Sequence, residues 1–163
     1  MKIRSFTEED VEELINLIAN FRITLAELKG IKKKFDLIAA KGELEYYQKN
    51  RFPIFIAEDV NGHIIGYHVC RVQDDVVWSE SLYVKSEERR KGVGSALYEK
   101  AEILAEKLGA DNVYNWVHPN NHRSIPFLKK KGYNVLNLIE LRKRRPNEKF
   151  NQQITVGKYI FDY

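Results

Sequence analysis

Two glycines separated by one residue, Gly92 and Gly94, stand where an apolar strand pattern gives way to a helical one. The first N–H groups of a helix have no partner within it, and the helix dipole adds partial positive charge at that end. Glycine also lets an anion approach the backbone without meeting a Cβ atom. Three cations, Arg89, Arg90 and Lys91, directly precede the first glycine. The segment is therefore typical of a phosphate-binding turn.

Three other interpretations compete with this one. A plain helix N-terminus with a flexible, glycine-rich entry also fits and stays open. A Walker loop does not fit, because it requires Gly-Lys followed by Ser or Thr after four intervening residues. A dinucleotide fingerprint does not fit either. It needs a third glycine or alanine where Leu97 stands, and it needs parallel strands where hairpins are predicted here.

A second motif occupies residues 121–133, which read Asn-His-Arg-Ser-Ile-Pro-Phe-Leu-Lys-Lys-Lys-Gly-Tyr. It contains an asparagine, a small residue three positions later, an aromatic–aliphatic pair and then Gly-Tyr. Residues 89–94 match the pattern Gln/Arg-x-x-Gly-x-Gly/Ala. With both motifs in this order, the chain resembles the GNAT acetyltransferases. The resemblance extends over nearly the whole chain and is weakest over residues 20–52.

The resemblance implies acetyl-CoA as the co-substrate and no metal. Backbone amides of the glycine turn would hold the diphosphate. The strand 79–84 would splay from a parallel neighbour at 113–117 to admit the pantetheine arm. Asn121 would bond the pantetheine region, although a simple helix N-cap is its other interpretation. The cofactor-binding residues implied in this way are Leu82, Tyr83, Val84, Arg89, Arg90, Lys91, Gly92, Val93, Gly94, Ser95, Asn121, Ser124 and Phe127.

Acetyl transfer to an amine requires a proton acceptor, because an amine with a pKa of about 10.4 is protonated at neutral pH and attacks only as the free base. Glu80 is the candidate base. Residues 80–84 are similar to the stretch in spermidine/spermine acetyltransferases that carries the proposed base. The alternative interpretation is a solvent-facing strand glutamate. The backbone N–H of Leu82 or Val84 is the expected donor to the oxyanion, so Glu80 and Leu82 are the predicted catalytic residues.

Two positions depart from the family pattern. Leu128 stands where many members have the tyrosine that protonates the leaving sulfur. Trp116 stands where ribosomal-protein N-terminal acetyltransferases have a catalytic glutamate. The acid therefore stays open among Tyr83, Tyr114 and water. Two functions follow: direct transfer of acetyl from acetyl-CoA to a primary amine in a ternary complex, or non-catalytic binding of acyl-CoA as a sensor or structural module.

A basic run, the single cysteine and two histidines are candidate sites for nucleic acid, covalent catalysis and metal. The basic run Arg142–Arg145 lacks aromatic interleaving, so we expect a solvated loop, with nucleic-acid binding as a third and weaker hypothesis. The resemblance implies that this loop borders the acceptor site. Cys70 lies in an apolar strand and is expected to be a buried core residue, which argues against a ping-pong route. His118 and His122 have no further metal ligands near them in the sequence. The expected acceptor is a small-molecule or protein amine, and a homodimer is left open.

Hydrophobic periodicity predicts the elements that hold these residues. Strands are expected at residues 3–6, 54–60, 63–69, 76–84, 113–117, 133–141 and 152–161. Thr7 is expected to cap the first helix with Asp10, and Asn61-Gly62 to form a hairpin turn in which both residues have positive φ. Further helices are expected over residues 26–49, interrupted near Gly30 and Gly42, and over 121–131.

The helix that begins at Gly92 is expected to end at Gly109 and to bury a stripe of five residues, Val93, Leu97, Ala101, Leu104 and Leu108. The expected fold class is α/β, as one domain over residues 1–163. Its mixed, mostly antiparallel sheet would have about seven strands, helices on both faces and a splayed parallel pair at its centre. This arrangement would place the glycine turn at the end of a central strand.

Composition fits such a domain. The 163 residues are 44% hydrophobic and 31% charged, with a net charge of +4. These values indicate a globular chain and exclude a disordered or collagen-like one. No apolar run approaches the length of about 18 residues that a membrane span needs, and no signal-peptide pattern follows Met1. A cytoplasmic protein is therefore expected.

Overall fold

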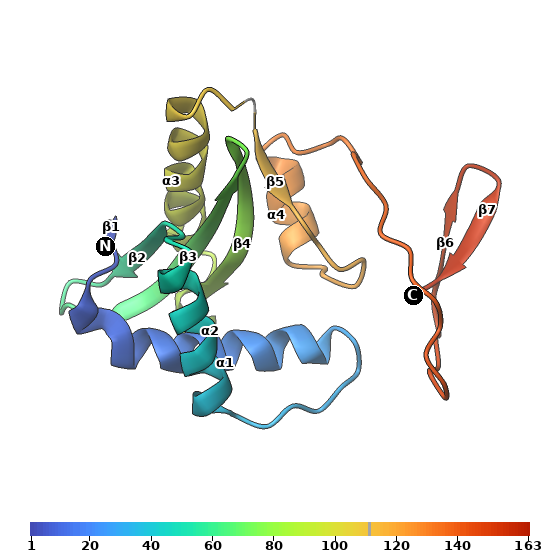
Figure 1. Ribbon diagram of the computed structural model, residues 1–163, viewed down its shortest axis with the longest axis horizontal. Helices are drawn as coiled ribbons and strands as arrows, with labels where there is room; N and C mark the ends of the chain where they lie inside the picture. The colour runs from blue at the N-terminus through green and yellow to red at the C-terminus, as the bar shows by residue number, and fades with distance from the viewer. Residues whose placement is uncertain (111) are drawn as a thin grey trace. The chain divides into compact units, whose positions relative to one another are not determined.

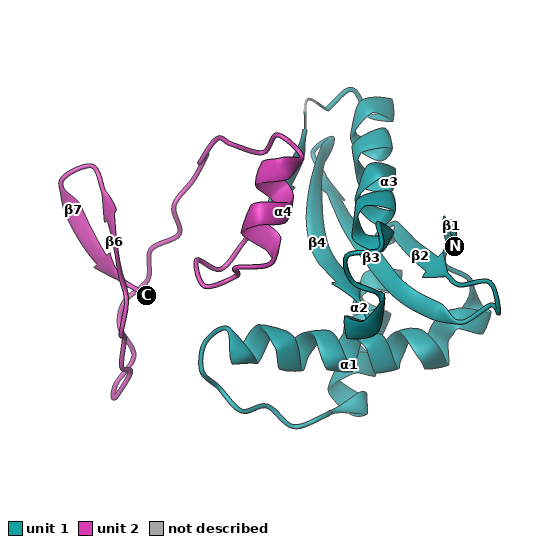
Figure 2. Cartoon of the chain, turned by 180° about the vertical axis from the view of Figure 1, so that it is seen from behind, with its two compact units in different colours: residues 1–116 teal, residues 117–163 magenta. Residues whose placement is uncertain are grey.

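The computed structural model describes residues 1–110 and 112–163. It divides into two compact units, Met1–Trp116 and Val117–Tyr163, which are described separately (Figure 2). The elements of the first unit are β1 (Lys2–Ser5), a 3₁₀ turn (Glu8–Asp10), α1 (Val11–Glu27), α2 (Leu37–Lys49), β2 (Ile54–Glu58), β3 (Ile64–Gln73), β4 (Val76–Val84), a 3₁₀ turn (Ser86–Glu88), α3 (Val93–Lys107) and β5 (Val113–Asn115) (Figure 1). The second unit holds α4 (Ser124–Lys130), β6 (Gln153–Val156) and β7 (Tyr159–Asp162). The prediction of one domain over residues 1–163 stays a prediction.

The five strands of the first unit form one sheet in the order β1-β2-β3-β4-β5. The first four pair antiparallel, and β4 pairs with β5 in parallel. With the separate β6–β7 hairpin the described residues contain seven strands, which is the predicted number, but they form two sheets instead of one. The parallel pair lies at the edge of the five-stranded sheet and not at its predicted place in the centre. The mixed, mostly antiparallel sheet with its parallel pair confirms the expected fold class.

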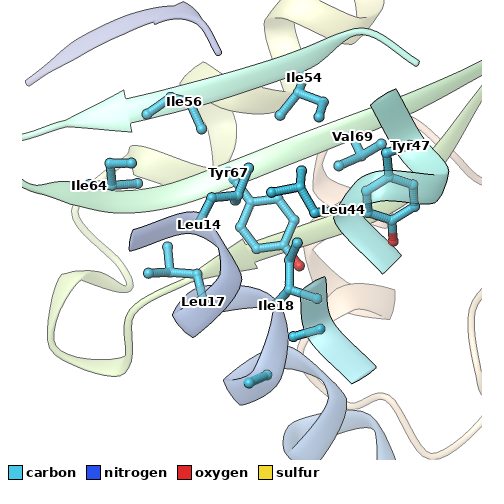
Figure 3. Packing of buried hydrophobic residues seen from close by; sticks show 12 residues of the cluster. Leu14, Leu17, Ile18, Leu44, Tyr47, Ile54, Ile56, Ile64, Tyr67 and Val69 are labelled. Carbon is cyan, nitrogen blue, oxygen red and sulfur yellow. The ribbon is translucent and has the colours of Figure 1, made fainter. Parts of the chain in front are cut away.

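Helices cover both faces of this sheet. Tyr67 and Val69 of β3 pack with Leu14 of α1 and Leu44 of α2 in the main core cluster (Figure 3). Side chains alternate along a strand, so His68 points to the other face, where its ring stacks on Tyr98 of α3. The sheet is therefore a middle layer, with α1 and α2 on one face and α3 on the other.

Two tight turns set the register of the central strands. Asp74 and Asp75 both have positive φ, 52° and 61°, and they join the paired residues Gln73 and Val76 in a two-residue hairpin. At the other hairpin Gly62 has a φ of 88°, but Asn61 does not share the left-handed conformation. The expectation that both residues have positive φ is therefore wrong for Asn61.

That second loop is longer than a two-residue turn. Its chain is held by Asp59 Oδ1, which accepts hydrogen bonds from the N–H groups of Asn61 at 2.8 Å and His63 at 2.9 Å. A carboxylate that bonds its own following backbone is an alternative way to close such a loop.

The helices depart from the predicted pattern in two places. In α3 Val93, Leu97 and Ala101 are buried as expected, but Leu108 is 37% exposed because it lies beyond the last helical residue. Leu104 is only partly buried, whereas Tyr98 and Ala105 are buried in the stripe. α2 also runs through Gly42 without the expected interruption. Thr7 and Asp10 do form a capping box, in which Asp10 Oδ2 accepts from the Thr7 N–H at 2.7 Å.

The second unit differs more from expectation. No strand forms over residues 133–141, and its apolar side chains are exposed at Val135, Leu136, Leu138, Ile139 and Leu141. Apolar alternation makes a strand only where a partner strand takes up its backbone groups, and the described part of this unit offers none there. The single strand expected over residues 152–161 is instead the hairpin β6–β7, because Gly157 adopts a φ of 60° and turns the chain.

A histidine is fully buried between the sheet and α3. His68 Nε2 lies 2.8 Å from Ser79 Oγ, and its Nδ1 lies 3.3 Å from the carbonyl oxygen of Leu97. Burial disfavours the charged ring and lowers the pKa of His68 from 6.5 to about 4. The folded protein therefore holds this ring neutral at a pH at which the unfolded chain would protonate it.

We expect acid to destabilise the fold through His68. The unfolded chain takes up its proton near the ordinary pKa of 6.5 and the folded chain only near 4, so stability falls across that window as the pH drops. Below the folded-state pKa, the free energy of unfolding is lower by about 3 kcal/mol because of this one histidine. Denaturant titrations at pH 7 and 4.5 measure it: His68→Gln would flatten the change, while His63→Gln, at an exposed histidine, would keep it. If His68→Gln lost as much stability between pH 7 and 4.5 as the wild-type protein does, His68 would not be the source of the acid sensitivity.

Candidate functional site

The junction between β4 and α3 leaves backbone donors open. Gly92 caps α3 in the left-handed conformation, with a φ of 87° and no side chain to bond the first turn. The first bond into the helix runs from the Ala96 N–H to the Gly92 carbonyl at 3.0 Å. The three N–H groups of Val93, Gly94 and Ser95 therefore precede the helical ladder and face the helix entrance. Such a set of donors binds an anion.

The three cations before Gly92 take different positions. Arg89 Nε donates to the Val84 carbonyl at 3.0 Å, and its guanidinium lies 5.6 Å from the Tyr83 ring centroid. Lys91 Nζ lies 3.1 Å from Glu88 Oε2 in a partly exposed pair that holds the chain only weakly. Arg90 is exposed and has a φ of 65°. Arg89 thus fixes the end of β4, while the other two cations stay available to an anion.

The edge of β4 beside β5 is open along its second half. The parallel pairing joins only Val77–Ser79 to Val113–Asn115. On the side of β3, the Lys85 N–H donates to the Ile65 carbonyl at 2.9 Å. In an antiparallel pair every second residue directs its N–H to the partner strand, so the N–H of Tyr83 also points to β3. The N–H groups of Leu82 and Val84 must therefore point away from β3. Among residues 1–110 and 112–163 no strand pairs with this edge of β4 beyond Ser79, so these N–H groups are available to an extended ligand arm.

Glu80 occupies a β-bulge at the point where the parallel pair ends. Val69 pairs with Ser81 and Cys70 with Ser79, which leaves Glu80 as the extra residue of β4. Its Oε2 lies 3.3 Å from Arg71 Nε, an ion-pair distance without the alignment of a hydrogen bond. Both side chains are largely covered, Arg71 at 20% exposed and Glu80 at 26%. The predicted base is therefore a partly exposed carboxylate beside a cation, and its catalytic role stays a prediction.

Hydroxyl groups support the bulge from the α1–α2 face. Tyr67 Oη and Ser81 Oγ are 2.8 Å apart, and the Tyr47 hydroxyl donates to the Glu43 carboxylate, which also pairs with Arg22. Burial raises the pKa of both Tyr47 and Tyr67 well above 10, so these hydroxyls stay protonated. Sequence reasoning missed this network because its members come from α1, α2, β3 and β4 and form no local motif.

Gly66 was also missed by reasoning from the sequence. A Cβ atom at this position would lie 2.8 Å from the Tyr83 carbonyl oxygen and 3.2 Å from Leu97 Cδ1. Only glycine lets β3, β4 and α3 approach this closely beneath the open edge. A glycine inside an apolar strand was the available signal.

The predicted cofactor residues fall into two groups. Leu82, Tyr83, Val84 and residues 89–95 lie together at the β4–α3 junction. Asn121, Ser124 and Phe127 lie in the second unit, so their part in the same site stays a prediction. There, Asn121 Oδ1 accepts from the Ser124 N–H at 2.9 Å at the start of α4, three residues later than the helix was expected to begin. Asn121 therefore supports the helix start.

Three other kinds of group can be assessed beside this site. Burial raises the pKa of the Cys70 thiol to about 12, so it carries no nucleophilic thiolate near neutral pH. Within residues 1–110 and 112–163, no three side chains of His, Cys, Asp or Glu gather as a metal site would require. Among those same residues, no helix has the length and apolar character to cross a bilayer.

Comparison with known families agrees with this architecture. The model of the acetyltransferase (GNAT) family matches residues 23–133, which include the glycine turn and the second motif. The chain therefore belongs to the GNAT acetyltransferase family, a family of acyltransferases.

An uncharacterized N-acetyltransferase of Methanocaldococcus jannaschii is 25% identical over 145 residues, or 85% of this chain. This chain spans only 62% of the length of that relative.

Solved structures share the fold at low identity. A GNAT-family acetyltransferase of Staphylococcus aureus gives a TM-score of 0.65 at 19% identity, covering 80% of this chain and 82% of its own. An aminoglycoside 6'-N-acetyltransferase of Acinetobacter haemolyticus gives 0.69 at 15% identity, covering 90% and 100%. An aminoglycoside N-acetyltransferase in complex with CoA gives 0.63 at 22% identity, covering 88% and 100%.

Proposed function

We propose that this protein transfers acetyl from acetyl-CoA to a primary amine by direct attack in a ternary complex. One observation carries the proposal: the open donors of Val93–Ser95 and the free edge of β4 lie in sequence along one path, and Glu80 stands at its far end. Membership of the GNAT family and the CoA complex of a protein of similar fold support the choice of cofactor.

In this proposal the first turn of α3 binds the diphosphate of CoA. The N–H groups of Val93–Ser95 donate to it, and Arg90 and Lys91 add positive charge. The N–H of Val84 bonds the pantetheine arm along the free edge, and the N–H of Leu82 is left for the acetyl carbonyl. When bound, acetyl-CoA supplies the thioester that the amine attacks. The N–H of Leu82 then stabilises the oxyanion, because its position is fixed by the β3–β4 ladder.

Glu80 accepts the proton that the amine must lose, directly or through a water molecule. Arg71 assists, because a guanidinium next to the carboxylate opposes a second positive charge and favours the neutral, nucleophilic amine. Leu128 is buried and has no proton to give to the departing thiolate. Tyr83, Tyr114 and water are the candidate proton sources in this proposal.

A thiol-release assay with acetyl-CoA and a panel of small amines and peptides tests the proposal, with CoA binding measured in parallel by calorimetry. Amine-dependent release of CoA, with CoA binding at one site per chain, is the expected result. Tight CoA binding without turnover on any amine would favour the alternative of an acyl-CoA-binding module. Absence of CoA binding would overturn both functions.

A further inference from the structure

An exposed indole ring directly follows the end of β5, next to the last residue that pairs with β4. Trp116 is 67% exposed, and tryptophan offers a large, rigid ring surface to a ligand. The last parallel pair is Ser79 with Asn115, so Glu80 and Trp116 are the first residues beyond it on their respective strands. The exposed indole and the proposed base therefore lie near each other just beyond the parallel pair, and Arg71 contacts both.

Arg71 links the two groups. Its guanidinium carbon lies 4.9 Å from the Trp116 ring centroid and 5.3 Å from that of Trp78, while its Nε lies 3.3 Å from Glu80 Oε2. Two further ring contacts extend the assembly, Trp78 to Trp116 at 4.9 Å and Trp78 to Tyr114 at 5.3 Å. Three aromatic rings thus form a cluster of tilted pairs with Trp78 in the middle, and its most exposed member is Trp116.

We infer, on the basis of the proposed function, that the amine acceptor carries an aromatic ring that stacks on the exposed surface of Trp116 while its amine lies at Glu80. A fourth ring would extend an aromatic cluster that the fold already holds in place. Offset or edge-to-face packing of two rings adds binding energy beyond the area that it buries.

A second cation on the acceptor fits this surface less well. The Arg71 guanidinium already lies 4.9 Å from the Trp116 ring, so an ammonium added to the same indole would meet its repulsion. The nearby carboxylate, Glu80, is already engaged by the reacting amine, so it cannot offset the charge of a second ammonium. An aromatic ring carries no charge and meets no such repulsion. The chemistry therefore selects an arylalkylamine, or a peptide amine beside an aromatic side chain, over a diamine.

Three amines of similar reach separate these possibilities: 2-phenylethylamine, 2-cyclohexylethylamine and putrescine. The wild-type protein should show a KM for 2-phenylethylamine about fivefold lower than for the cyclohexyl compound, which is as apolar but has no π face. Trp116→Ala should remove this preference, and Trp116→Phe should keep most of it. A preference for putrescine, or an equal rise in KM for all three amines in Trp116→Ala, would overturn the inference.

A binding readout that needs no turnover distinguishes failure of this inference from failure of the proposed function. The chain has two tryptophans, so a ¹⁵N spectrum contains two indole signals, and Trp116→Phe assigns them. With CoA present, 2-phenylethylamine should shift the Trp116 indole signal and saturate, and putrescine should not. A shift without turnover would support the aromatic subsite while the transferase function fails. Turnover without a shift would overturn the subsite and leave the transferase function intact.

Discussion

Replacing Glu80 with glutamine is expected to lower kcat for amine acetylation by about 100- to 1,000-fold, because the amine loses its proton acceptor. Glutamine has nearly the same shape, so the bulge and the contact with Arg71 should persist. The Kd for CoA should change little, since the donors at Val93–Ser95 lie at the other end of β4. Steady-state rates with calorimetry on the same preparation measure both quantities.

The control for this substitution is Glu99→Gln, on an exposed position of α3. Its kcat should match that of the wild-type protein. A further check is the rate at high pH, where a growing fraction of the amine is already neutral and the variant should recover part of its activity. If Glu80→Gln retained wild-type kcat at neutral pH, Glu80 would be a structural partner of Arg71 and the base would have to be sought elsewhere.

The second large effect is expected from a carboxylate at the helix entrance. Gly94→Asp should raise the Kd for CoA by about 100-fold, because a negative charge would lie among the N–H donors that receive the diphosphate. The fold should tolerate the change, since a Cβ at Gly94 meets only Val84 Cγ2 at 3.8 Å. A negative side chain in the first turn interacts favourably with the helix dipole, so the midpoint of thermal unfolding should stay the same or rise.

Gly94→Ala is the matched control, since it adds the Cβ atom without the charge. It should weaken CoA binding far less than Gly94→Asp. Loss of affinity together with loss of stability would mean that the aspartate disturbs the fold. Unchanged CoA affinity in a stable Gly94→Asp protein would place the diphosphate somewhere other than the first turn of α3.

The sequence was sufficient for the parts of the fold that depend on local signals. The bounds of β4, the capping box of Thr7 and Asp10 and the helix start at Gly92 follow from periodicity and from residues with particular backbone preferences. The open donors at this junction could be predicted for the same reason, since every helix N-terminus leaves its first N–H groups without helical partners.

Features that depend on pairing between distant segments could not be predicted. Nothing in residues 76–84 marks Glu80 as a bulge, because a bulge arises from the register against β3. The Arg71–Glu80 pair depends in turn on that register, and the contact of Trp78 with Trp116 depends on the pairing of β4 with β5. The strand expected over residues 133–141 shows the converse error, since apolar alternation alone does not provide a partner strand.

The most direct test of CoA binding at the α3 entrance is a titration of ¹⁵N-labelled protein with CoA, followed through its assigned backbone amides. Saturable shifts should concentrate on Val93, Gly94 and Ser95, with a second set at Leu82 and Val84 along the free edge of β4. If CoA leaves these amides unmoved, or shifts only the basic loop at residues 142–145, the helix entrance does not bind the diphosphate and the proposed function loses its physical basis.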